Sequence, residues 1–163
     1  MQTETHGAVW LDGEQQHAWR AYLVGTTLLM DRLDRDLREQ HNLSMPEYEI
    51  LVRLSESPER RLRMAVLADS LSHSRSRVTH TVTRMERAGL VDRRACLADG
   101  RGVEALLTDS GFAVLARAAH THVRGVRELL VEVGSDEDFA AVGRIFDAVT
   151  DRLVDANPGL DIR

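Results

Sequence analysis

The chain has 163 residues, which is enough for one full domain or for a small domain with an oligomerisation arm. The single cysteine, Cys96, excludes an intrachain disulfide, and the N-terminus lacks the pattern of a secretory signal peptide. No apolar run approaches the roughly 20 residues that a bilayer span requires, so we expect a cytoplasmic protein without membrane contact.

Charge is unevenly distributed along the chain, although the formal net charge is −5. Residues 60–103 hold ten arginines against four acidic residues, a net +6, which leaves −11 on the remainder. A local basic patch is sufficient to attract phosphate, so the acidic total does not exclude a nucleic-acid partner.

The N-terminal part predicts a loose arm over residues 1–13 and then one long helix over residues 14–40. The apolar positions of this helix recur at helical spacing, and acidic and basic residues at i, i+4 fill its other side. The positions with helical spacing are Trp19, Tyr22, Leu23, Thr26, Leu29, Met30, Leu33 and Leu37. Because a small domain does not need so long a helix, we expect its N-terminal half to pack on another subunit.

A second helix is predicted to follow a capping box at Ser44 and Glu47, with Pro46 in its first turn. Its residues Ile50, Leu51 and Leu54 are expected to point inward, and the helix should stop near residues 57–58. Residues 61–63 are expected to pair as a short third strand beside the hairpin that comes later in the chain.

Two short helices with a tight turn between them are predicted over residues 65–71 and 74–89. In the second helix, Val78, Val82 and Met85 recur at i, i+4 and i+7 as one narrow apolar stripe. Ser74 is a favourable N-cap, and Gly89 supplies the left-handed residue that ends a helix. This is the pattern of a helix-turn-helix, whose second helix enters the DNA major groove.

The outer face of the second helix is basic and rich in hydrogen-bonding groups, which suits a polyanion. For the contacts with base edges we expect Arg77, His80 and Arg84. The remaining polar residues are expected to hold the DNA backbone, which sets register without reading sequence. These backbone contacts are Ser74, Ser76, Thr79, Thr83, Arg87 and Arg94.

Residues 90–96 and 102–107 each predict a short strand, joined by the small residues of a turn at positions 99–102. A β-hairpin after a helix-turn-helix is a wing. Arg101 at its tip is expected to enter a minor groove, where negative potential is concentrated.

Two further helices are predicted at the C-terminal end, one from residue 109 to about residue 133 and one that follows a break at residues 134–138. Thr108 caps the first, and the polar residues 134–138 break it and cap the second. The inward residues expected in the first are Phe112, Leu115, Ala116, Ala119, Val123, Val126, Leu129 and Leu130. Those in the second are Phe139, Val142, Ile145, Phe146, Val149 and Leu153. This apolar surface exceeds what a monomer can cover, which predicts pairing across a two-fold axis.

Residues 99–111, DGRGVEALLTDSG, resemble the wing signature of the MarR family of bacterial transcription regulators, D-x-R-x-x-x-V-x-L-T-x-x-G. Ala105 replaces the usual Val. Residues 67–69 and 84–91 also resemble the family, and the order of elements agrees over nearly the whole chain. His80 stands where many members carry Arg.

The resemblance implies a mainly α fold with a small β-hairpin wing: a winged helix-turn-helix with N- and C-terminal dimerisation helices. We divide the chain into an arm and dimerisation helix over residues 1–43, a DNA-binding domain over 44–107 and dimerisation helices over 108–163. The implied function is a nucleoid-associated homodimer that binds a palindromic operator on double-stranded DNA, usually as a repressor. Asp99 is then either a turn former or the acceptor that orients Arg101 or Arg94.

Members of the family often bind small aromatic or phenolic acids between the dimer helices and the winged helix. Residues that could line such an effector pocket here are Trp19, Arg20, Tyr22, His41 and Tyr48. The other interpretation is that Trp19 and Tyr22 are interface packing.

Other chemistries are less well supported. His120 and His122 lie two residues apart on a helix and point about 200° away from each other, so no metal site is expected. Cys96 is either a plain strand residue or a redox sensor. No catalytic set stands out, so neither an enzyme nor a cofactor is expected. The rival from another class is a winged helix that binds protein and not DNA, which should lack a basic outer face.

Overall fold

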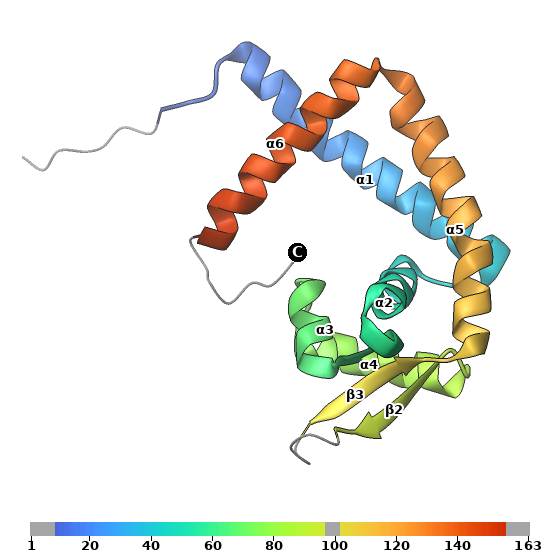
Figure 1. The fold of residues 1–163 in the computed structure, drawn as a ribbon. Coiled ribbons are helices and arrows are strands. Elements are labelled where there is room, and N and C mark those ends of the chain that lie inside the picture. The colour runs from blue at the N-terminus through green and yellow to red at the C-terminus, as the bar shows by residue number, and fades with distance from the viewer. Residues whose placement is uncertain (1–8, 97–101, 156–163) are drawn as a thin grey trace, which may run out of the picture.

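The computed structural model describes residues 9–96 and 102–155 (Figure 1). The six α-helices of this described part are α1 (Gly13–His41), α2 (Met45–Glu56), α3 (Met64–Ser70), α4 (Arg75–Arg87), α5 (Asp109–Leu129) and α6 (Asp136–Asp155). Its three strands are β1 (Arg61–Arg63), β2 (Val91–Ala95) and β3 (Val103–Leu107). Short 3-10 turns cover Pro58–Arg60 and Val131–Val133. In Figure 1, helices α2 to α4 and the sheet form one end of the molecule, α1 and α6 cross at the other, and α5 runs between the two ends.

Helix α1 is bounded by strong local signals. Asp12 and Gln15 form a reciprocal capping box at its start, and Asn42, with a φ of 53°, adopts the left-handed conformation at its end. The expected i, i+4 pairs form between Arg32 and Asp36 at 3.0 Å and between Arg38 and Asp34 at 2.6 Å. The N-terminal half of the helix is largely exposed to solvent in the single chain.

Helix α2 begins at the predicted capping box and is fixed to α1. The Ser44 backbone N–H donates to Glu47 Oε2 at 2.8 Å, which confirms the predicted start. The next backbone N–H, that of Met45, donates to Asp34 Oδ1 on α1 at 2.7 Å. The residues expected to point inward, Ile50, Leu51 and Leu54, are fully buried.

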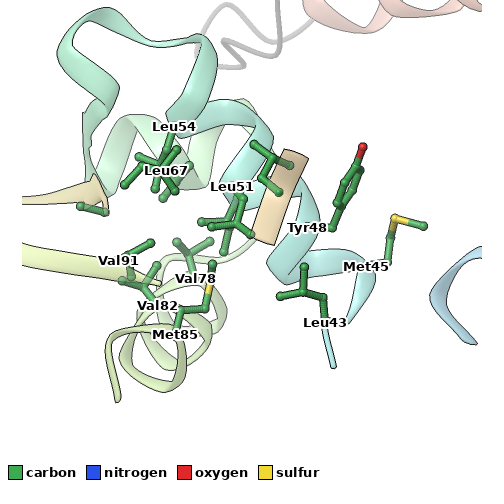
Figure 2. Packing of buried hydrophobic residues seen from close by; sticks show 14 of the residues in the cluster. Leu43, Met45, Tyr48, Leu51, Leu54, Leu67, Val78, Val82, Met85 and Val91 are labelled. Carbon is green, nitrogen blue, oxygen red and sulfur yellow. The ribbon is translucent and has the colours of Figure 1, made fainter. Parts of the chain in front are cut away.

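The helix-turn-helix is confirmed. Ser74 caps α4 by accepting a hydrogen bond from the Arg77 backbone N–H at 3.3 Å, and Gly89 has the predicted positive φ of 72°. The stripe of α4 faces the core formed with α2, α3 and β2, as Figure 2 shows. It comprises the predicted Val78, Val82 and Met85.

The three strands form one antiparallel sheet in the order β1-β3-β2, so the predicted hairpin and the minimal third strand are both confirmed. Ala105 lies opposite Leu62 on one side and Arg93 on the other, and it is fully buried. The predicted wing-tip residues Asp99 and Arg101 lie outside the described residues.

The predicted inward face of α5 is partly wrong. Leu115 is buried as expected, but Phe112, Ala116, Val123 and Leu129 are exposed. The face that packs on the rest of the chain is formed by Gly111, Leu115, Ala118, Thr121 and Gly125, all of which except Leu115 have small side chains. Small side chains allow the backbone of α5 to approach its neighbours closely. This face therefore packs on the rest of the chain, although the larger residues dominate the hydrophobic pattern. The helix also ends at Leu129, earlier than predicted.

Helix α6 begins at Asp136, within the segment predicted to break the chain and cap this helix, but it contributes no buried residue in the single chain. The Ser135 backbone N–H donates to Asp138 Oδ2 at 2.9 Å and closes its first turn. The helix crosses α1 (Figure 1), and the rings of Tyr22 and Phe146 lie 5.4 Å apart where they meet. Its six large apolar residues predicted to face inward, from Phe139 to Leu153, are between 39% and 60% exposed.

One apolar cluster joins α1 and α5 to the winged helix, whereas α6 contributes no residue to it. Leu33 and Leu37 of α1 and Leu115 and Ala118 of α5 belong to the same buried cluster as the winged helix. The long helices are therefore packed directly onto the module that carries α4. None of the described helices has the length and apolar character needed to cross a membrane.

The surroundings of Gly111 leave no room for a side chain. A Cβ at this position would lie 2.0 Å from the Leu90 carbonyl oxygen and 2.9 Å from Leu107 Cδ1. We expect Gly111→Ala to lower the free energy of unfolding by about 1–3 kcal/mol, measured by urea denaturation. Gly13→Ala is the matched control, because nothing lies within 4 Å of its added Cβ. Equal stability of the two variants would contradict this packing.

Candidate nucleic-acid interface

The outermost ridge of α4 lies about 180° from its buried stripe, as the helical repeat of about 100° per residue requires. The ridge consists of Ser76, His80, Thr83 and Arg87, which are exposed except for the half-buried Thr83. Four hydrogen-bonding side chains of different length are therefore presented side by side. The Thr83 hydroxyl donates to the Thr79 carbonyl at 2.8 Å.

Arg77 and Arg84 lie one above the other on the flank of α4 that faces α2. Both are exposed, but their surroundings differ. Arg84 Nε donates to Glu47 Oε1 at 2.8 Å, whereas Arg77 makes no ion pair with the described residues. Of the three residues expected to read bases, Arg77 and His80 are therefore available, and Arg84 is already engaged.

The opposite flank of α4 borders a groove beside the wing. The groove has a volume of about 460 Å³, and three of its lining residues are the arginines Arg63, Arg75 and Arg93. The predicted backbone contact Thr79 lines it as well. Arg93 is held in place by Glu86, with Nη2 at 2.6 Å from Oε2.

Arg63 and Arg75 were missed by the sequence reasoning. Arg75 stands four residues before Thr79 and thus on the same flank of α4, which is the signal that could have identified it. Arg63 ends a three-residue strand, and its position became clear only from the pairing of β1 with β3. The predicted backbone contact Arg94 is exposed and lies 3.7 Å from Asp92.

Glu47 is a nearly buried carboxylate whose oxygens both have partners. Its Oε2 accepts from the Ser44 backbone at 2.8 Å and from the Ser44 hydroxyl at 2.7 Å, and its Oε1 accepts from Arg84. Burial by itself would raise the pKa of Glu47, but the hydrogen bonds from Ser44 and Arg84 outweigh it and hold the pKa below its ordinary value. The Glu47–Arg84 pair is therefore ionised at neutral pH.

The five residues expected to line an effector pocket form two separate groups in the single chain. Trp19 stacks on Tyr22 with ring centroids 5.6 Å apart, and Arg20 lies within 3.5 Å of Gln16. His41 lies 22 residues further along α1, which is about 33 Å along a straight helix. One chain therefore does not bring all five together.

The second group, His41 and Tyr48, packs against α5. His41 Nε2 is 2.7 Å from Thr121 Oγ1, and the Tyr48 ring lies 4.7 Å from that of His122. Burial lowers the pKa of His122, and no described residue bonds to its buried Nδ1. Burial likewise raises the pKa of Tyr48.

Cys96 directly follows β2, is 3% exposed, and its thiol lies 3.5 Å from Glu104 Oε1, so its burial favours a plain structural residue over the redox sensor. Within residues 9–96 and 102–155, no three His, Cys, Asp or Glu side chains gather as they would around a metal ion.

The described residues define a winged helix-turn-helix protein with a basic outer face. The family model for the MarR family matches residues 43–103. The chain is 42% identical to Sco3205 of Streptomyces coelicolor, a MarR family transcriptional regulator solved in complex with DNA. That match covers 88% of this chain and 94% of the other, with a TM-score of 0.85.

Two further relatives agree with this class. AbsC of S. coelicolor, another MarR family transcriptional regulator, is 38% identical, with 90% of this chain and 98% of the other covered and a TM-score of 0.84. The HTH-type transcriptional regulator PecS of Dickeya dadantii is 29% identical over 76% of this chain and 79% of its own length. The chain thus belongs to the MarR family of transcriptional regulators.

The low pKa of Glu47 predicts a pH-dependent contribution to stability. A carboxylate whose pKa is depressed by folding stabilises the fold above its unfolded pKa, and this contribution is lost as the pH falls through the folded value. We expect Glu47→Gln to be less stable than the wild type at about pH 7 by about 1–3 kcal/mol. The difference should shrink as the pH falls from the unfolded pKa through the lower folded pKa, because the carboxylate then takes up a proton. Urea denaturation over a pH series measures it, and a pH-independent difference would contradict the ionised pair.

Proposed function

We propose that the chain is a sequence-specific DNA-binding transcriptional regulator that acts as a homodimer on an inverted repeat, as a repressor by steric occlusion. The observation that carries the proposal is the exposed side of α4, where Arg77, His80 and Arg87 face solvent and a groove lined by further arginines borders the flank opposite Arg77. The relative Sco3205, at 42% identity, was solved with DNA bound.

The proposed contacts divide by position on α4. Arg77 and His80 read base edges in the major groove, since Arg can grip guanine O6 and N7 with two hydrogen bonds. Ser76, Thr83 and Arg87 on the outer ridge hold the backbone. The groove beside the wing accepts the phosphates of one strand, because it combines the exposed cation of Arg75 with a concave shape.

Two parts of the proposed interface rest on sequence. The wing tip, with Arg101 in the minor groove and Asp99 orienting it, follows from the family signature. Arg94 on β2 contacts the backbone between the tip and α4. The Ser74 hydroxyl, which caps α4, lies 3.3 Å from Ser76 Oγ and completes the backbone contacts at the start of the helix.

The dimer is proposed from the apolar residues that the single chain leaves exposed on α1, α5 and α6. We assign residues 1–43 and 108–163 to dimerisation and residues 44–107 to DNA binding. In such a dimer the two α4 helices lie in successive major grooves, about 34 Å apart. A regulator of this kind acts in the cytoplasm, at the nucleoid, and we propose no catalytic role.

A small aromatic or phenolic effector is the remaining element of the proposal. In the single chain, His41 and Tyr48 sit with His122 where α1, α2 and α5 meet, and Trp19 and Tyr22 sit at the crossing of α1 and α6. The first group supports a ligand site better, because it joins the winged helix to the long helices. The second is interface packing. An effector would act by binding unequally to two dimer geometries.

Arg77 tests the proposed base contact. We expect Arg77→Ala to cost about 1–3 kcal/mol of binding free energy on the cognate site and to relax specificity there. Selection of bound genomic fragments supplies the site, and fluorescence anisotropy at fixed salt measures the affinity. Arg117→Ala, which removes an exposed cation from α5, is the matched control. Equal losses on cognate and random DNA would refute base reading, and no salt-sensitive binding at all would favour the protein-binding alternative.

The oligomeric state is a second test. The exposed apolar faces predict a mass in solution of twice the 18.3 kDa of one chain. Multi-angle light scattering over a range of concentrations measures this mass. A concentration-independent monomer would overturn the proposed dimer.

A further inference from the structure

The cation at Arg84 differs from the others on the outer side of α4, because a carboxylate from another helix neutralises it. Its Nε lies 2.8 Å from Glu47 Oε1, and its side chain is still 55% exposed. Arg77, two turns earlier on the same flank, has no such partner among the described residues. The flank therefore presents one free cation and one restrained cation.

The position of Glu47 is fixed independently of Arg84. Its Oε2 receives two hydrogen bonds from Ser44, one from the backbone and one from the hydroxyl, so the capping box of α2 holds the carboxylate. It also lies in the first turn of α2, where the helix dipole favours negative charge. Arg84 thus bends towards a preformed acceptor.

Moving Arg84 onto DNA would break this pair and leave a nearly buried carboxylate without its counter-ion. Losing the counter-ion costs free energy, because the desolvated carboxylate then has no opposite charge to stabilise it. If Arg84 were free, it would stand about 10.5 Å along the helix from Arg77 and reach the same DNA strand as a second cation. Phosphate contacts of this kind raise affinity for every sequence equally.

We propose that Glu47 is a specificity-determining positioning residue, which holds Arg84 away from DNA and so limits binding to phosphate that carries no sequence information. This inference rests on the proposed function as a DNA-binding regulator. Arg84 then connects α4 to α2 and does not read a base, in contrast to the expectation from sequence.

Glu47→Gln is the informative substitution, because glutamine keeps the shape and the capping box while it removes the charge. We expect the variant to bind a scrambled duplex several-fold more tightly and to show a smaller ratio of operator to scrambled affinity. Its plot of log affinity against log salt should steepen by about 0.9 for each phosphate newly contacted, or about 1.8 for a dimer. Fluorescence anisotropy on both duplexes between about 50 and 200 mM salt measures these quantities.

Three further variants assign the effect to Arg84. Arg84→Met should keep the wild-type salt slope on both duplexes, and the double variant Glu47→Gln/Arg84→Met should behave like it. Glu56→Gln removes the same charge from the exposed end of α2 and should change neither slope. Circular dichroism of each variant confirms that it is folded before binding is measured.

Two results would overturn the proposal. One is a wild-type salt slope for folded Glu47→Gln, and the other is a shallower slope for Arg84→Met on the operator, which would mean that Arg84 contacts DNA in the native protein. Failure of the proposed function is distinguishable, because the wild type would then show no preference for any operator. The slopes on scrambled DNA would still report whether Glu47 restrains Arg84.

Discussion

The burial of the apolar stripe of α4 is the constraint on which the rest of the interface depends. Val78, Val82 and Met85 are each at most 1% exposed, and burying side chains of this size contributes about 1.5–3 kcal/mol apiece. Because a helix turns by about 100° per residue, fixing these three also fixes which residues form the outer ridge and the two flanks. The polar chemistry of α4 is thus a geometric consequence of its packing on α2 and α3.

Much of the fold could be predicted from sequence because its signals are local. Ser44, Ser74 and Thr108 each cap a helix through a contact three residues away, and Gly89 ends α4 with a positive φ. The hairpin strands likewise flank a short segment of small, turn-forming residues at positions 99–102. Such features are determined by residues only a few positions away in the sequence, so they can be predicted without knowing the tertiary structure.

The parts that were missed depend on contacts between distant segments. In α5 the packed face contains Gly111 and Gly125, and a pattern of hydrophobicity gives such small residues little weight although close approach favours them. The Glu47–Arg84 pair joins residues 37 positions apart. Glu47 also has an adequate local explanation as a capping residue, so nothing in the sequence indicated a second role.

The hydrogen bond between Asp34 Oδ1 and the Met45 backbone has a mechanical consequence. It clamps the first turn of α2 to the last turns of α1, and Glu47, one half-turn further on, grips α4. These two contacts connect α1 to α4 through the first turn of α2. In a two-fold assembly, a small change in the angle of α1 at the subunit interface would alter the distance between the two α4 helices.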